Sequence, residues 1–486
     1  MKIAIYYLLL LSIIFSQNYI PADPYYLLSY ELKQFNKLMP IHSTSFRPFY
    51  IKSNKLISVA INNEIYINNN VSNQENMDVR YIGKGIANYT SLSISGYSRF
   101  LAFNLEPYTL NDNYKDIETY NRPNPFKFLN DSKEKKSNGV GFRKADLYLH
   151  YNGFGIGIAN SNMWWGPGLQ GSFSMTNNTV GFKNYMLGTI KEIRWKKVGF
   201  MGRYTFSELN NKKDYEATYF TSITSQITIY NEQIISIGFS RNYLTGGVDV
   251  GYPWSKEDAQ RIVFEGVFIK NLQQLDYTIA GHDPWDQTIS IWTDISFPRN
   301  KFKIYLELGF NDNRFNLWDF IVHPDHAMGS IIGFRKYGLF NNKNLLFGFE
   351  YANLIKGRHH IFRATPNWYE RNHYDDFSYE GRRWGAHSGS DSDDLLIFFG
   401  IINNKWSFIP SLNFERHGVS TYRPPEIKSE FRLDVRYNIK KFEIGLVYEN
   451  QFEAHLGFPP DQYFLDEISG KRRTNTFMIK LRRVIY

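Results

Sequence analysis

The sequence contains no cysteine. This absence excludes a disulfide framework, a thiol nucleophile and thiolate ligation of zinc or an iron–sulfur cluster. Beyond the N-terminus, no stretch reaches the roughly 18 uncharged apolar residues that a membrane-spanning helix needs. No phosphate-binding P-loop, dinucleotide fingerprint or nucleophile-elbow pattern occurs either. We therefore expect no catalytic residue, no cofactor and no bound metal ion.

Aromatic residues, in contrast, are abundant. The 486 residues include 35 Tyr, 39 Phe and 10 Trp, which together make up 17% of the chain, although the mean hydropathy is -0.42. A soluble core is usually filled with aliphatic side chains. Rings with one apolar and one polar side are favoured at a membrane interface, so the composition indicates a membrane protein.

The N-terminus has the pattern of an export signal. Lys2 is followed by an apolar run over residues 3–15 and by the small residue Ser16. This arrangement predicts a signal peptide over residues 1–16, since the run is too short to span a bilayer. An exported chain without spanning helices is either soluble or crosses the membrane as a closed β-barrel.

Residues 17–96 differ in pattern from the remainder of the chain. Asp23 and Pro24 are typical of a helix start, the apolar residues that follow recur at helical spacing, and Pro40 ends the segment. Short Asn-rich β runs follow at 56–61 and 65–67. We expect residues 17–96 to form a small periplasmic region of one helix and short strands, and residues 97–486 to form the barrel.

Apolar and polar residues alternate along most of the chain after residue 97. In residues 302–310 and 442–448 one face is apolar and the other polar or charged, which is the signature of a strand with one apolar side. Alternation alone does not distinguish a soluble sandwich from a barrel whose apolar face meets lipid.

The connections between these strands favour the barrel. Short turns at 196–197, 231–232, 298–301, 341–343, 403–404 and 440–441 alternate with long irregular stretches at 207–217, 241–259, 311–327, 354–392, 415–427 and 451–473, and links at 271–273 and 282–286 complete the series. Outer-membrane barrels have short periplasmic turns and long extracellular loops. The sequence predicts an all-β transmembrane antiparallel barrel of about 18 strands.

The densest motif is Trp164-Trp165-Gly166-Pro167-Gly168. Gly and Pro impose a sharp turn, and the two indoles fix its position against neighbouring groups. One interpretation is an inward-folded loop or rim turn that shapes the barrel. The other is a stacking platform for a glycan, because aromatic rings suit the apolar faces of sugars.

This motif resembles the hallmark of the Wzi-type capsule assembly family of outer-membrane proteins. Residues 42–49, residues 379–387 and the acidic run 391–394 resemble further segments of the same family. The resemblance implies a large plugged barrel with a periplasmic helical region and extracellular loops that hold capsular polysaccharide at the cell surface.

Loop 354–392 supplies further candidate ligand contacts. Arginine offers paired donors for carboxylate or phosphate groups, and Trp and Tyr offer stacking faces. The alternative is a loop that folds inward as a plug and satisfies its own charges. The candidate polysaccharide-binding residues are Trp164, Trp165, Trp368, Tyr369, Arg371, Tyr374, Arg382, Arg383 and Trp384.

Two other clusters invite a metal-site interpretation. Asp391, Asp393 and Asp394 lack the turn glycine and distal Glu of a calcium loop, so a solvated loop is favoured. The spacing of His323, Asp325 and His326 fits no zinc signature, and an exposed pair of histidines is favoured there.

The expected function is non-enzymatic: anchoring or organising capsular polysaccharide or exopolysaccharide at the cell surface through extracellular loops. The alternatives are a diffusion porin, which lumen charges such as Arg432 and Glu449 allow, and an outer-membrane hydrolase of lipid or glycan. The formal charge of +9 fits outer-membrane lipids or an acidic polysaccharide better than nucleic acid. We expect a monomer in the bacterial outer membrane.

Overall fold

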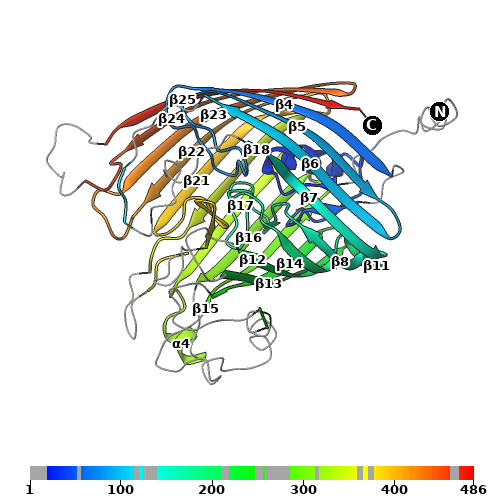
Figure 1. Ribbon diagram of the computed structural model, residues 1–486, viewed down its shortest axis with the longest axis horizontal. Helices are drawn as coiled ribbons and strands as arrows, with labels where there is room; N and C mark the ends of the chain where they lie inside the picture. The colour runs from blue at the N-terminus through cyan, green and yellow to red at the C-terminus, as the bar shows by residue number, and fades with distance from the viewer. Residues whose placement is uncertain are drawn as a thin grey trace.

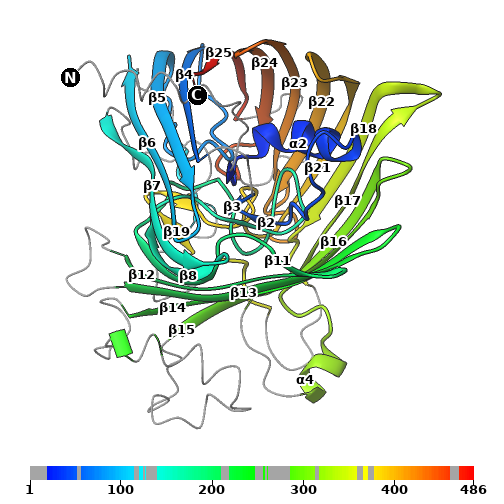
Figure 2. The same cartoon turned by 90° about the vertical axis from the view of Figure 1, so that its right-hand side faces the viewer.

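The protein is a closed antiparallel β-barrel whose lumen is filled by its own chain (Figures 1 and 2). The computed structural model describes residues 19–51, 56–113, 120–123, 126, 139–209, 218–246, 256–257, 260, 285–311, 317–357, 365–369, 377–459 and 470–485. The signal peptide predicted at 1–16, the link predicted at 271–273 and residues 282–284 of the link predicted at 282–286 lie outside these residues; residues 285–286 begin β15. Among the described residues, no helix is long and apolar enough to span a bilayer.

The wall has 18 strands, as predicted, because β10 and β11 both pair with β12 and together form one interrupted strand. The wall closes where β25 pairs with β4, from Thr476 opposite Asn68 to Val484 opposite Ala60. The strands are β4 (Ile57–Asn68), β5 (Gly85–Tyr97), β6 (Leu101–Asp112), β7 (Gly139–Tyr151), β8 (Phe154–Ala159), β10 (Asn184–Thr189), β11 (Ile193–Trp195), β12 (Val198–Leu209), β13 (Thr218–Tyr230), β14 (Ile234–Gly246), β15 (Trp285–Phe297), β16 (Phe302–Asn311), β17 (Met328–Leu339), β18 (Asn342–Asn353), β21 (Ser392–Ile402), β22 (Trp406–His417), β23 (Glu426–Ile439), β24 (Phe442–Ala454) and β25 (Arg472–Val484).

The predicted boundary at residue 97 is wrong, because β4 and β5 belong to the wall. In β4 the inward residues Ala60, Asn62, Glu64 and Tyr66 are buried, and the outward Ile61 is exposed. Asparagines on both faces weaken the apolar alternation of this strand, which explains why its sequence reads as a short β run rather than a barrel strand.

Short and long connections alternate around the barrel. The short ones include 98–100, 152–153, 231–233, 298–301, 340–341 and 440–441, and they all lie at the end of the barrel that also holds the start of β4 and the end of β25. We call this the short-turn end and the opposite one the long-loop end. The alternation agrees with the pattern predicted from the sequence, but β14 pairs directly with β15, where the predicted series placed two further links.

The predicted N-terminal helix is present, but it lies inside the barrel rather than in a separate periplasmic region. Asp23 caps the 3-10 turn η1 (Pro24–Tyr26), its carboxylate accepting the N–H of Tyr25, and α2 (Leu27–Phe35) follows. Leu28, Leu32 and Phe35 pack against inward-facing residues of the wall. Figure 2 shows α2 lying across the lumen, enclosed by the strands.

Ion pairs fix α2 within the lumen. Glu31 accepts two hydrogen bonds from the guanidinium of Arg335 on β17, at 2.8 and 2.9 Å, and lies 3.5 Å from the ammonium of Lys303 on β16. Burial alone would raise the pKa of Glu31, but Arg335 and Lys303 outweigh it and lower the pKa to about 2. The negative charge of Glu31 on α2 is therefore paired with cations on the inner face of the wall.

Four segments fill the remaining lumen, and we call them together the plug: residues 19–51, 69–84, 160–183 and the described parts of 365–391. The first carries β1 (Tyr19–Ile20), β2 (Phe46–Arg47) and β3 (Phe49–Tyr50), the third carries β9 (Trp164–Trp165), and the last carries β19 (Ser378–Tyr379) and β20 (Arg382–Arg383). β2 pairs with β9, and β1 with β3. A short helix, α4 (Leu317–Val322), lies beyond the wall at the long-loop end (Figure 1).

Replacing Glu31 by alanine should destabilise the protein by about 3 kcal/mol, because it leaves the buried Arg335 without its carboxylate partner. The measurement is the urea unfolding midpoint in detergent micelles. The matched control is Glu232→Ala, which removes an ion pair with Arg299 whose side chains are 71% and 79% exposed and should cost less than about 0.5 kcal/mol. Equal midpoints for the two variants would contradict the role of Glu31 as an anchor.

Candidate functional site

The centre of the plug is a cluster of aromatic rings. Trp384 contacts Phe220, Phe377 and Phe182 with ring centroids 4.9 to 5.6 Å apart. Trp368 stacks on Phe173 at 4.9 Å. Edge-to-face and offset contacts of this kind are the favoured arrangements of aromatic pairs, so the cluster is a hydrophobic core inside the lumen.

The two glycines of the Trp-Trp-Gly-Pro-Gly motif are required by close packing. Gly166 has a φ of +149°, and a Cβ there would lie 2.3 Å from a carboxylate oxygen of Glu307. A Cβ on Gly168 would lie 2.0 Å from the carbonyl oxygen of Gly171. Residues with side chains cannot occupy either position without displacing the loop. The motif therefore encodes a tight turn pressed against the wall.

Two wall carboxylates hold this turn. Glu350 on β18 accepts the backbone N–H groups of Leu169, Gln170 and Gly171 at 2.6 to 2.9 Å. Glu307 on β16 accepts the N–H of Phe173 and the hydroxyl of Ser172, both at 2.9 Å. Successive N–H groups that converge in this way form an anion-binding concavity. Here the anion is part of the protein, and it fixes residues 169–173 to the inner face of the wall.

The structure brings together seven of the predicted ligand contacts and buries them. Their exposed fractions do not exceed 4%; they are Trp164, Trp165, Trp368, Tyr369, Arg382, Arg383 and Trp384. Arg371 and Tyr374 lie outside the described residues. A direct contact of these nine residues with polysaccharide stays a prediction. The burial of the seven favours the alternative interpretation of an inward-folded loop that shapes the barrel.

The buried arginines of this set contact other parts of the plug. Arg382 hydrogen bonds to the side-chain oxygen of Gln74, and its guanidinium lies 5.0 Å from the centroid of the Tyr81 ring. The guanidinium of Arg383 lies 5.8 Å from the Tyr369 ring. Arginine stacked on aromatic rings inside a protein binds segments to one another. These contacts join residues 377–391 to residues 69–84.

A cluster of charged side chains lies where the plug meets the long-loop end of the wall. His387 Nε2 lies 3.2 Å from Asp394 and 3.4 Å from Glu75, and Lys428 forms ion pairs with Glu75 and Glu415. We call His387, Glu75, Asp394, Glu415 and Lys428 the rim cluster. Burial by itself lowers the pKa of His387, but Glu75, Glu415 and Asp394 outweigh it and raise the pKa to about 10. His387 is thus a cation at neutral pH.

A metal ion is not favoured at the rim cluster or at the predicted aspartate cluster. Oxygen and nitrogen atoms of Glu75, His387 and Glu415 lie within 4.8 Å of one another, but the ammonium of Lys428 already supplies the cation between the two glutamates. The carboxylates of Asp391 and Asp393 accept hydrogen bonds from Thr421 and Arg416. His323 and His326 are buried with their rings 5.8 Å apart, which corrects the prediction that they are exposed.

Comparisons with known proteins were made for the whole chain. Residues 70–403 match the family described as capsule assembly protein Wzi. A solved structure of Wzi from Escherichia coli, an outer-membrane protein involved in group 1 capsule assembly and described as a carbohydrate-binding β-barrel, gives a TM-score of 0.57 at 11% identity over 86% of this chain and 83% of that one. This likeness shows the fold.

Two further solved structures are less similar to the chain. OpdK of Pseudomonas aeruginosa gives a TM-score of 0.44 at 7% identity, covering 88% of this chain and 98% of that one. OccAB4 of Acinetobacter baumannii gives 0.41 at 9% identity with the same coverage. Both scores are too low to carry an argument. No curated protein matches the chain.

Trp384→Ala should destabilise the protein by about 3–5 kcal/mol, because it leaves a cavity at the centre of the plug. The matched control is Trp195→Ala at the short-turn end, where the ring is 73% exposed. The urea midpoints of both variants, measured side by side with the wild type, provide the comparison. A Trp384→Ala midpoint as high as that of the control would show that the plug contributes no packing energy.

The rim cluster gives a pH prediction. The stabilisation from protonated His387 is complete below the ordinary histidine pKa of 6.5 and is lost as the pH rises through about 10. His387→Ala should therefore lower the urea midpoint strongly near neutral pH and have a smaller effect above about 10. A difference between variant and wild type that is independent of pH would mean that the imidazole carries no charge in the folded protein.

Proposed function

Because the chain belongs to the Wzi capsule assembly family, we propose that this outer-membrane barrel anchors or organises capsular polysaccharide at the cell surface through its long loops, without catalysing a reaction. The observation that carries the proposal is the filled lumen. A plug with a packed aromatic core leaves the long-loop end as the surface on which a large polymer is held. In outer-membrane barrels this end faces the outside of the cell.

The plug supports the proposal in a second way, through loop shape. Thr176 of the 160–183 segment hydrogen bonds to the carbonyl oxygens of Trp384 and Gly385, and Asn178 hydrogen bonds to that of Arg383. The loops are thus tied to one another within the lumen. A surface that is rigid before its ligand arrives loses less conformational entropy on binding, which suits the retention of a polymer by many weak contacts.

The filled lumen argues against the alternative of an open diffusion porin for large solutes. To test the hydrolase alternative, the purified protein is incubated with each substrate class. Conversion of the lipid substrate and release of reducing ends from the polysaccharide are then measured. Turnover of either substrate by the purified protein would replace the non-enzymatic proposal.

Arg371→Ala combined with Tyr374→Ala tests the predicted loop contacts. The gene for the chain is deleted in its own strain and replaced by each variant, and surface-bound and released polysaccharide are quantified. We expect the deletion to release the polymer, and the double variant to retain several-fold less than the wild type because a forked donor and a stacking face are both lost.

The control for this experiment is Trp195→Ala with Lys440→Ala, which removes an exposed aromatic and an exposed cation at the short-turn end. It should retain the polymer at the wild-type level. Normal retention in the deletion strain would refute the capsule role. Loss in the deletion strain with normal retention by the double variant would refute these two contacts.

A further inference from the structure

Three cavities lie in a row between the plug and one side of the wall. Two lie near the short-turn end and one lies more centrally. Tyr26 and Arg482 line both outer cavities, Lys480 lines the first and the central one, and Arg436 lines the second and the central one. The cavities therefore adjoin one another along β22 to β25 and β4.

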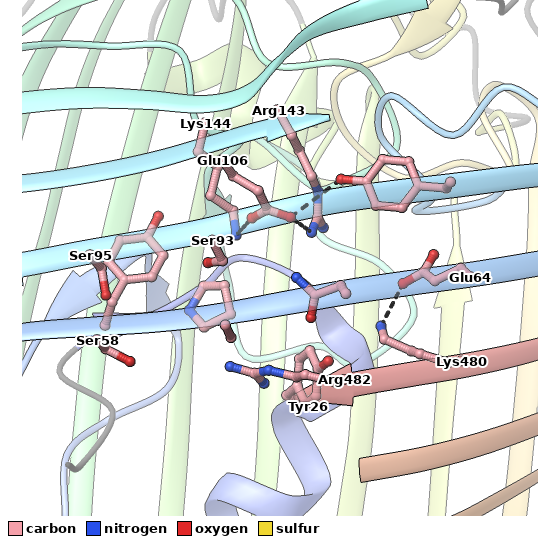
Figure 3. A pocket seen from close by; sticks show the side chains of 15 residues that line it. Tyr26, Ser58, Glu64, Ser93, Ser95, Glu106, Arg143, Lys144, Lys480 and Arg482 are labelled. Carbon is pink, nitrogen blue, oxygen red and sulfur yellow. Dashed lines mark hydrogen bonds and ion pairs between the residues drawn. The ribbon is translucent and has the colours of Figure 1, made fainter. Parts of the chain in front are cut away.

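The lining of this row is polar and carries charges of both signs. In the first cavity, Lys144 and Arg143 form ion pairs with Glu106, and Lys480 forms one with Glu64 (Figure 3). The central cavity is lined by charged residues of the wall and of the plug, among them Glu430, Arg432, Asp434, Asp23 and Arg80. Polar cavities large enough for a water molecule usually hold water. The three cavities thus form a series of polar spaces that share lining residues along part of the lumen.

The inner constriction of this path consists of rings and cations. Arg436 lies 3.5 Å and Lys480 4.1 Å from the centroid of the Tyr25 ring, and Lys480 lies 5.0 Å from that of Tyr26. Arg482 continues the series at 5.2 Å from Tyr26. The same cations also form ion pairs, Lys480 with Glu64 at 2.8 Å and Arg436 with Asp434 at 2.9 Å, so rings and ion pairs together make up this constriction.

The outer constriction is the rim cluster. Glu75 belongs both to the lining of the central cavity and to the cluster, where it pairs with Lys428 and lies 3.4 Å from His387. Two members, Glu75 and His387, come from the plug, whereas Glu415 and Lys428 come from β22 and β23 of the wall. The cluster thus joins the plug to the wall at the long-loop end of the central cavity.

We propose that this row of cavities is a gated path for small hydrophilic ions, and that the rim cluster of Glu75, His387, Asp394, Glu415 and Lys428 is its gate. The closed state is held by ion pairs between plug and wall. Each pair is buried, so removing the cations leaves carboxylates that repel one another in a poorly solvated place. The path goes beyond the retention of polysaccharide, which needs only the outer surface.

The charges facing His387 determine how the gate closes. Glu75, Asp394 and Glu415 surround its Nε2 atom, Lys428 lies between Glu75 and Glu415, and Glu430 lies 3.7 Å from Lys428. The raised pKa of His387 keeps the imidazole protonated at neutral pH. The gate is consequently closed under ordinary conditions.

The test measures ion current through the full-length protein in planar bilayers bathed in potassium chloride. The wild type should conduct rarely. The double variant His387→Ala, Lys428→Met should raise the time-averaged conductance roughly tenfold or more, because the loss of partners from buried charges destabilises the closed state. A second variant, Glu75→Gln, keeps the side-chain volume, weakens the same pairs and should raise the conductance in the same direction.

The matched control is Arg416→Met. Arg416 is the neighbour of Glu415 on β22, but its side chain faces outward, where it pairs with Asp393 with a 2.9 Å hydrogen bond. The Arg416→Met substitution removes an ion pair at the same level of the barrel as the rim cluster, and it should leave the conductance at the wild-type level. All variants are compared after heat-dependent electrophoresis has shown that the barrels are folded. Folded gate variants that conduct no better than Arg416→Met would overturn the proposal.

The natural absence of cysteine allows the path itself to be mapped. In the His387→Ala, Lys428→Met background, Ser411→Cys places a thiol in the central cavity. A positively charged thiosulfonate reagent should then block most of the current. Ser290→Cys, on the packed side of the plug where Ser290 is fully buried against Ser174, should leave it unchanged. A current that the reagent fails to reduce in the Ser411→Cys variant would place the ions elsewhere and overturn the assignment.

Discussion

The structure depends on one constraint: charges on the inner face of the wall need partners. A large barrel has a polar lumen, and carboxylates that point into it are stable only when water or donors surround them. Here Glu307 and Glu350 receive backbone N–H groups of the Trp-Trp-Gly-Pro-Gly loop, and Arg335 receives Glu31 of α2. The same groups that would line a water-filled pore thus select and position the segments that close it.

Sequence reasoning succeeded where periodicity is strong and failed where the partner of a polar face matters. Residues 302–310 show their apolar face directly, and the turn at 440–441 is marked by two lysines. The strand around the inward-facing Glu307, however, shows the same alternation of apolar and polar residues whether Glu307 contacts water or a plug. For this reason the sequence predicted the barrel and its family, left the place of Trp164 open between an inward-folded loop and a glycan platform, and did not predict the place of α2. The charge cluster around His387 was missed because its members come from distant segments.

The plug divides the lumen unequally, and this division has functional meaning. On one side the aromatic core around Trp384 packs against inward-facing residues of the wall. On the other side charged residues of β22 to β25 face the plug across cavities. A single barrel can therefore combine a rigid platform for the outer loops with a narrow hydrated margin, because packing and ion pairing dominate on different sides.

The pairing of β2 with β9 is also a mechanical joint. Phe46 and Arg47 belong to the N-terminal segment, which enters the lumen from the short-turn end, and Trp165 and Trp164 belong to a loop that enters from the opposite end. Thr176 then connects that loop to residues 384–385. The N-terminal segment is thus bonded through β2 and β9 to a loop from the opposite end, and through Thr176 to residues 384–385, so that a continuous series of hydrogen bonds crosses the lumen.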